Sequence, residues 1–207
     1  MATQEELKKA LSLISLEWGR QNNRFDKRSN FIYRVETVDE CLQKARVMAI
    51  DENYVLHRWY NYQTSIYCEG LFVKYGAQKE KQLYNHDIDI YINEIPYDVK
   101  LTVYPAKLKR SGEILNLHNR DDKNTLIRWM YANQSQEGRK HLKNRMFIVC
   151  NGENTYQNLA LKSDFDIIET RISGYFHFLE NNEPNKLVIQ DAGQEYEVYS
   201  DIISIEK

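Results

Sequence analysis

The sequence has few cysteines and no pattern that joins them. Cys41, Cys68 and Cys150 are odd in number and far apart, and no C-x-x-C pair occurs. This spacing argues against a disulfide framework and against a structural zinc site. Each cysteine lies within an apolar segment, so we expect all three to pack in the core of a protein kept under reducing conditions.

Long apolar runs are also missing. No run approaches the roughly 20 residues that span a membrane, and the first residues, MATQEELKK, lack the charged-then-apolar order of a signal peptide. We therefore expect a cytoplasmic protein with no membrane partner. The 207 residues, of which 42% are hydrophobic and 28% charged, suffice for one domain with a sizeable core.

The motifs of several enzyme classes are absent. The sequence contains no G-x-G-x-x-G, Walker or G-x-S-x-G motif, which argues against dinucleotide binding, nucleotide triphosphate hydrolysis and the serine hydrolase elbow. The five histidines show no zinc-binding spacing.

Charge is nearly balanced overall but unevenly distributed. The formal net charge is −2, which argues against a chain that coats nucleic acid through bulk charge. From 105 to 145 there are ten Lys and Arg against four acids, whereas 163–207 holds ten acids against three bases. A basic middle beside an acidic tail suggests that one face meets a polyanion. Solvated helix faces are the alternative explanation.

Hydrophobic periodicity predicts an α/β domain, 1–207, in three parts: N-terminal helices (1–51), a core (52–151), and a C-terminal helix and hairpin (152–207). Capping boxes at Thr3 and Thr37 begin the first two helices. The predicted helices are 3–20, 37–50, 52–75, 122–142 and 163–180, and the predicted strands are 31–35, 87–92, 96–103, 146–150, 187–190 and 196–205, with loops at 21–30 and 108–121.

The third predicted helix carries an acid where an apolar residue is expected. Its inward stripe consists of Val55, Trp59, Tyr62, Ile66 and Val73. Glu69 falls on the same stripe, three residues after Ile66 and four before Val73. A carboxylate on the buried side of a helix is costly unless something pairs with it.

The clearest local signal is a β-hairpin formed by 87–92 and 96–103, with a turn near Asn93 and Glu94. Side chains along a strand alternate between its two faces. One face of this hairpin is wholly apolar, so we expect it to be buried. It consists of Ile88, Ile90, Ile92, Ile95, Tyr97, Val99, Leu101 and Val103.

The opposite face of the hairpin carries acids and one lysine. Pairing about the turn sets Asp89 opposite Asp98, and Asp87 opposite Lys100. Directly opposed like charges destabilise a sheet, and Lys100 offsets only one of them. With Glu69 nearby, up to four carboxylates gather around one lysine. Such hard oxygen ligands suit Mg²⁺ or Mn²⁺.

This order of parts resembles the PD-(D/E)XK nuclease superfamily. The resemblance rests on Glu69 in a helix, Asp89 or Asp87 on one strand, Asp98-Val99-Lys100 on the next strand, and a following helix and strand. It covers roughly 52–151, about half the chain, and departs from the family pattern in lacking the nominal proline. The resemblance implies a restriction-endonuclease-like fold, with a mixed central sheet flanked by helices and an α-β-β-β-α-β core. The N-terminal helices and the C-terminal hairpin are additions to that core, and 114–117 is the candidate for its third strand.

The resemblance also implies roles for the residues. Asp89, Asp98 and the Val99 carbonyl would ligate the cation, with Asp87 as the alternative to Asp89. Lys100 would orient or help deprotonate the attacking water, and Glu69 would hold a metal-bound water or a second cation. Basic residues after the hairpin and on the next helix would contact backbone phosphates. These are Lys107, Lys109, Arg110, Arg139, Lys140 and Lys143.

The sequence therefore predicts a Mg²⁺- or Mn²⁺-dependent endonuclease of restriction, repair or mobile-element type. Double-stranded DNA is the expected partner by analogy with the superfamily alone, and a homodimer is a possible assembly. Two alternatives remain open. One is a nucleic-acid-binding module on the same fold that does not cut. The other is a protein-interaction module that docks through its acidic C-terminal part.

Overall fold

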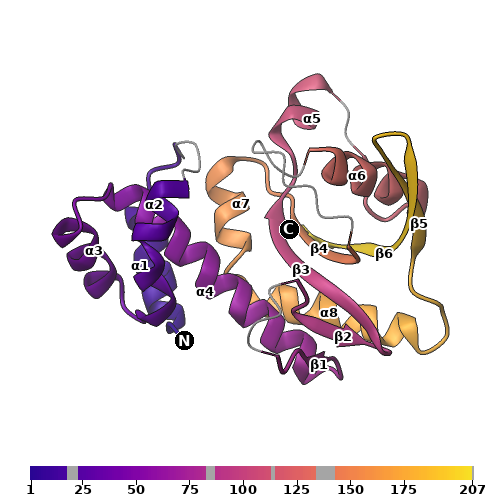
Figure 1. Ribbon diagram of the computed structural model, residues 1–207, viewed down its shortest axis with the longest axis horizontal. Coiled ribbons are helices and arrows are strands. Elements are labelled where there is room, and N and C mark those ends of the chain that lie inside the picture. The colour runs from indigo at the N-terminus through magenta and orange to yellow at the C-terminus, as the bar shows by residue number, and fades with distance from the viewer. Residues whose placement is uncertain (18–22, 83–86, 113–114, 134–142, 207) are drawn as a thin grey trace.

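The computed structural model describes residues 1–17, 23–82, 87–112, 115–133 and 143–206. Helices flank a six-stranded mixed sheet (Figure 1), which confirms the predicted α/β class. The helices are α1 (Gln4–Leu13), α2 (Asn23–Arg28), a 3₁₀ helix (Asn30–Arg34), α3 (Val38–Val47), α4 (Glu52–Lys74), α5 (Ala106–Ser111), α6 (Arg120–Ala132), α7 (Thr155–Leu161) and α8 (Phe165–Leu179). The strands are β1 (Gln78–Lys79), β2 (Ile90–Ile92), β3 (Ile95–Val103), β4 (Arg145–Cys150), β5 (Lys186–Asp191) and β6 (Gln194–Ile205).

The strand order in the sheet is β1-β2-β3-β4-β6-β5. Strands β1, β2 and β3 form an antiparallel meander, β3, β4 and β6 are parallel, and β5 returns antiparallel on β6. The prediction that the C-terminal hairpin is an addition to the core is wrong. Its strand β6 lies inside the sheet and pairs with β4 along 200–205. Alternation in the sequence predicts a strand there but does not reveal its partner.

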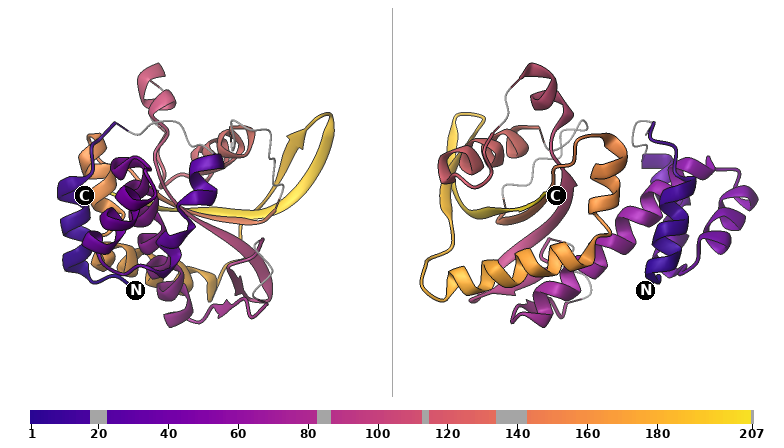
Figure 2. Two further views of the ribbon diagram at one scale, coloured as in Figure 1. Left: turned by 60° about the vertical axis from the view of Figure 1, so that its left-hand side comes forward. Right: turned by 180° about the vertical axis from the view of Figure 1, so that it is seen from behind.

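Each face of the sheet is covered by its own helices. On one face, α4 and α8 pack on alternate residues of β3, β4 and β6 such as Val99, Ile148 and Ile203; this first core extends to the N-terminal helices. On the other face, α6 covers Phe147, Val149 and Ile202, which belong to a second core. Seen from behind, α4 and α8 lie side by side in front of the sheet (Figure 2).

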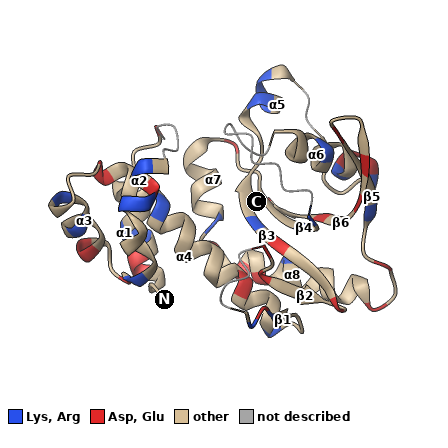
Figure 3. Ribbon diagram, viewed as in Figure 1, with Lys and Arg blue, Asp and Glu red and all other residues tan. Residues whose placement is uncertain are grey.

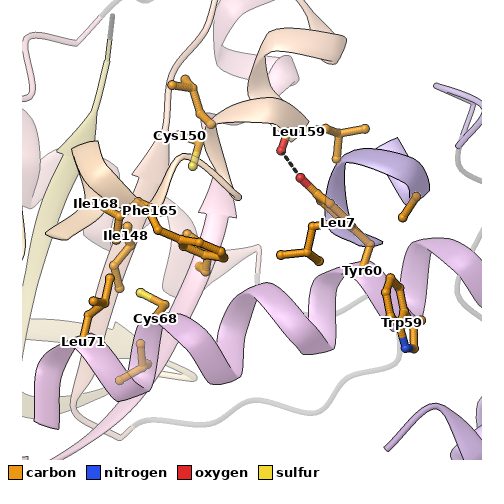
Figure 4. Packing of buried hydrophobic residues seen from close by; sticks show 14 of the residues in the cluster. Leu7, Trp59, Tyr60, Cys68, Leu71, Ile148, Cys150, Leu159, Phe165 and Ile168 are labelled. Carbon is orange, nitrogen blue, oxygen red and sulfur yellow. Dashed lines mark hydrogen bonds between the residues drawn. The ribbon is translucent and has the colours of Figure 1, made fainter. Parts of the chain in front are cut away.

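Long-range contacts tie α4 to both ends of the chain. The Tyr60 hydroxyl donates to the Leu159 carbonyl of α7 at 2.7 Å (Figure 4). Trp59 Nε1 donates to the Val35 carbonyl at 2.8 Å. Cys68 and Cys150 lie in this first core, and all three cysteines are free and buried, as predicted. Within the described residues, no helix combines the length and apolar character of a membrane span.

Several predicted elements differ from the structure near the N-terminus. Helix α1 ends at Leu13 instead of residue 20, because Ile14 takes an extended backbone conformation. Residues 21–30, predicted as a loop, contain α2, and the predicted strand 31–35 is the 3₁₀ helix. The N-cap half of both predicted capping boxes is confirmed: the Thr3 and Thr37 side chains accept hydrogen bonds from the backbone N–H groups of Glu6 and Glu40. The Glu6 carboxylate accepts from the Val38 N–H, and the Glu40 carboxylate pairs with Lys44.

The third strand of the meander also lies elsewhere than predicted. Residues 115–117 of the predicted strand 114–117 are not in a strand, and the third strand is β1, at Gln78–Lys79. Two exposed polar residues give no alternation signal.

Three other elements also differ from the prediction. The predicted loop 108–121 contains most of α5, and helix α7 was not predicted. Strand β2 begins at Ile90 instead of residue 87. Helix α6 begins at Arg120 after the cap Asn119, whose side chain accepts from the N–H of Asp121 at 2.8 Å.

Candidate functional site

Glu69 lies on the C-terminal half of α4, facing the edge of the sheet. Its side chain is only 12% exposed, as its predicted inward position requires, whereas Val73 of the same predicted stripe is 39% exposed. The nearest cation is the Lys79 ammonium of β1, 3.9 Å from Glu69 Oε2. Burial, and next the neighbouring Asp89, raise the pKa of Glu69 to about 7. The positive charges of Lys79 and Lys100 lower the pKa of Glu69, but by less than burial and Asp89 raise it.

Asp89 stands where the hairpin ladder ends. Asn93 and Glu94 both have positive φ, which places the turn where it was predicted and sets Ile90 opposite Tyr97. Ahead of Ile90, the Asp89 N–H still donates to the Tyr97 carbonyl at 2.9 Å. The Asp89 carboxylate then accepts from the Val99 N–H at 2.7 Å. This bond holds the carboxylate against β3.

The side chains of Asp89 and Asp98 interact as predicted, although regular pairing of the two strands stops one residue short, at Ile90 and Tyr97. Burial raises the pKa of the Asp89 carboxyl, the hydrogen bond from Val99 lowers it, and the negative charge of Asp98 raises it again. Asp98 itself is 8% exposed. Two acids therefore share a largely buried position between the chain ahead of β2 and strand β3.

Two cations flank the Asp98 carboxylate. Lys100 Nζ lies 2.5 Å from Oδ1 and Arg145 Nε lies 3.3 Å from Oδ2. Arg145 begins β4 directly beside Asp98 in the parallel register, and its guanidinium lies 5.5 Å from the centre of the Tyr131 ring. Arg145 Nε makes no hydrogen bond to the described part of the chain, so its contact with Asp98 is an ion pair without aligned geometry. The sequence prediction missed Arg145 because the pairing of β3 with β4 is not visible locally.

Asp87 does not join this group. It was predicted to lie opposite Lys100, but ladder pairing stops at Ile90 and the chain turns away. Asp87 is exposed and forms an ion pair with Lys143. Lys100 pairs with Asp98 on its own strand instead, with a side chain 46% exposed. Of the two open alternatives, the structure places Asp89, and not Asp87, beside Asp98.

The predicted phosphate contacts are scattered. Lys107 and Arg110 are exposed on α5. Lys109 is engaged within the molecule: its ammonium donates to the Gly152 carbonyl at 2.6 Å and lies 5.8 Å from the Tyr104 ring centre. Lys143 is held by Asp87. Arg139 and Lys140 lie outside the described residues.

Acidic segments of α4, of the chain ahead of β2 and of β3 gather beside a basic segment of β3 (Figure 3). The donors are all carboxylate oxygens, which suit a hard divalent cation such as Mg²⁺. Within the described residues, no three His, Cys, Asp or Glu side chains are already arranged as a metal-binding group. Lys100 and Arg145 face the two oxygens of Asp98 instead.

No family model, curated protein or solved structure matches this chain. Its function is therefore inferred from the chemistry of the group formed by Glu69, Asp89, Asp98 and Lys100.

Proposed function

We propose that this protein is a Mg²⁺-dependent nuclease that hydrolyses DNA phosphodiester bonds at Glu69, Asp89, Asp98 and Lys100. One observation carries the proposal. The carboxyl groups of Glu69, Asp89 and Asp98, from α4, the chain ahead of β2 and β3, lie close enough to affect one another's ionisation, and Lys100 pairs with Asp98 at 2.5 Å. An exposed hairpin with ordinary cross-strand ion pairs would not bury two acids together.

The order of elements supports the same proposal. Apart from the short α5, the chain from α4 to β4 runs helix, three strands, helix, strand. This is the order of the common core of the PD-(D/E)XK superfamily, which the sequence resembles. Asp98-Val99-Lys100 lies on the second strand of the hairpin, and Glu69 comes from the preceding helix.

Each residue has a distinct role in this proposal. Asp89 and Asp98 would hold the cation with the Val99 carbonyl, and Glu69 would orient a water beside it. When bound, Mg²⁺ supplies positive charge that neutralises the phosphate and lowers the pKa of a nearby water. Lys100, whose side chain is 46% exposed, can leave Asp98 to contact the phosphate and the attacking water.

Arg145 acts differently from Lys100 because it is buried. It stays beside Asp98 and holds that carboxylate in place, so it is a positioning residue. The exposed Lys107 and Arg110 of α5 would contact backbone phosphates without reading sequence. DNA binding should therefore weaken as salt increases.

The test is cleavage of supercoiled and linear DNA with Mg²⁺, Mn²⁺ or Ca²⁺. Asp98→Asn and Lys100→Ala should each lower the rate at least about 100-fold, with retained fold and much of the DNA affinity. Two exposed residues distant from the site supply matched controls, Asp121→Asn and Lys8→Ala, which should cut like the wild type.

The outcomes separate the alternatives. Unchanged cleavage in both Asp98→Asn and Lys100→Ala would refute the assignment. DNA binding by the wild type without any turnover would favour a non-cleaving binding module. No affinity for nucleic acid at low salt would favour a protein-interaction module.

A further inference from the structure

A cavity of about 450 Å³ opens beside Lys100, between β3 and α6. Lys100 and Thr102 of β3 form one side of it, and Trp129 and Met130 of α6 form the other. Arg145 also lines it. The cavity therefore adjoins the carboxylate group through Lys100 and Arg145, the two cations that flank Asp98. Its volume lies within the range of small-molecule sites, about 300–1,000 Å³.

The walls of this cavity combine an aromatic ring, apolar side chains and positive charge. Trp129 is half-buried, with part of its ring packed against the second core. Val103 and Pro105 add apolar surface. Among the described residues that line it there is no Asp or Glu, whereas Lys100 and Arg145 are both present. Such a site suits a flat ring attached to an anion.

Asn133 adds a polar group to the rim of the cavity. Its Nδ2 donates to the Trp129 carbonyl at 2.8 Å, which fixes the amide at the end of α6. This bond uses the amide nitrogen of Asn133 and not its amide oxygen. Amide side chains at such positions recognise the polar edges of nucleobases.

We propose that this cavity binds an unstacked base of the DNA strand whose phosphate lies at Lys100, so that the substrate is a nucleotide outside a continuous duplex. The inference rests on the proposed function for the position of the phosphate. Trp129 stacks on the base, and Asn133 accepts from its edge. Stacking on an aromatic side chain is worth about 1–3 kcal/mol per base and tolerates any sequence.

A base inside a duplex cannot reach Trp129 without leaving its stack. That step costs a few kcal/mol in paired DNA and least at mismatched, damaged or single-stranded positions. The cavity therefore selects single strands, bulges and mismatches over continuous duplex, whatever the sequence.

The test compares two ligands of equal charge without any metal ion. A 12-nucleotide oligothymidylate is titrated against an abasic 12-mer at low salt, with fluorescence anisotropy as the readout. The wild type should bind the oligothymidylate about tenfold more tightly. Trp129→Leu, which keeps an apolar contact with the second core, should lower this ratio below about threefold, and Trp129→Phe should restore most of it.

Phe178→Leu is the matched control, because Phe178 is an aromatic residue of α8 that is 48% exposed and lies away from the cavity. It should bind like the wild type. Asn133→Ala is the second variant in case Trp129→Leu fails to fold, and it should lower the ratio about threefold. An unchanged ratio in Trp129→Leu, or in Asn133→Ala when only that variant folds, would overturn the base site.

A cleavage arm distinguishes this inference from the nuclease proposal. Wild-type protein with Mg²⁺ should cut a duplex with one unpaired thymidine faster than the fully paired duplex. A binding ratio that depends on Trp129 without cleavage of any substrate would support the base site and refute the nuclease. Equal cutting of both duplexes would support the nuclease and refute the base site.

Discussion

The carboxylate of Asp89 accepts a hydrogen bond of 2.7 Å from the backbone N–H of Val99, on the strand that carries Asp98 and Lys100. Backbone pairing of β2 with β3 ends at Ile90 and Tyr97, and the Asp89 side chain extends the connection to Val99. It also fixes a negative charge beside a second one. Two functions, strand pairing and charge placement, therefore depend on one side chain.

Substitutions at Asp89 should separate these two functions. Asp89→Asn keeps an oxygen that accepts from Val99, so its free energy of unfolding should match or exceed that of the wild type without metal. Asp89→Ala leaves the Val99 N–H without its acceptor and should lose about 1–2 kcal/mol. Urea unfolding measures both. Equal stability of the two variants would show that the bond to Val99 contributes nothing.

Arg145 should stabilise the folded state through Asp98. Among the described residues, Arg145→Met leaves the exposed Lys100 as the one cation paired with the buried Asp98, so the free energy of unfolding should fall by about 3 kcal/mol. The double variant Asp98→Asn/Arg145→Met should recover most of this loss, because no buried charge remains unpaired. Arg128→Met, at an exposed position of α6, is the control. Additive losses in the double variant would contradict the ion pair.

Lys162 should make stability depend on pH. Lys162 is 8% exposed, and its ammonium donates to Asn61 Oδ1 at 2.7 Å. Two titratable groups interact with it: Cys150 raises the pKa of Lys162, and Lys162 lowers the pKa of His57. Burial lowers the pKa of Lys162 from 10.5 to about 8. Between these values the unfolded chain binds a proton that the folded chain does not, so stability rises with pH.

The variant that tests this is Lys162→Met. At pH 7 it should raise the free energy of unfolding by about 3 kcal/mol, since the penalty for charging the buried amine is then fully present. The gain should shrink as the pH rises from 8 towards 10.5. Lys8→Met, at an exposed position of α1, should show no such trend. A gain independent of pH would mean that Lys162 titrates normally.

Divalent cations should stabilise the protein through the same carboxylates. At 10 mM, a cation with a dissociation constant of about 1 mM adds roughly 1.4 kcal/mol, which raises the Tm by about 3–6 °C in a chain of this size. Asp98→Asn should abolish the shift, and Asp121→Asn should retain it. Differential scanning fluorimetry with Mg²⁺, Mn²⁺ and Na⁺ at matched ionic strength gives the answer. An equal shift in Asp98→Asn would place the cation elsewhere.

The sequence predicts those parts of the site that depend on local pattern. Helix α4, the turn at Asn93 and Glu94, and the register that opposes Ile90 to Tyr97 follow from periodicity over a few residues. Asp87 was misplaced because the prediction extended the ladder past Ile90. A strand pattern does not show where hydrogen-bonded pairing stops.

Local periodicity does not predict which strands distant in the sequence pair with one another. Arg145 reaches Asp98 only because β4 lies parallel to β3, and β6 is interior only because it pairs with β4. The residues near each strand in the sequence do not show which distant strand it pairs with. Strand β1 was missed because two exposed polar residues carry no alternation.

The most direct test of the carboxylate group is a crystal of this protein soaked in Mn²⁺, with anomalous scattering used to locate the ion. A peak within ligand distance of both the Asp89 and Asp98 carboxylates, with Lys100 turned away from Asp98 and no peak in Asp98→Asn crystals, is the predicted result. Mn²⁺ bound only at other sites, with the Lys100–Asp98 pair intact, would contradict it.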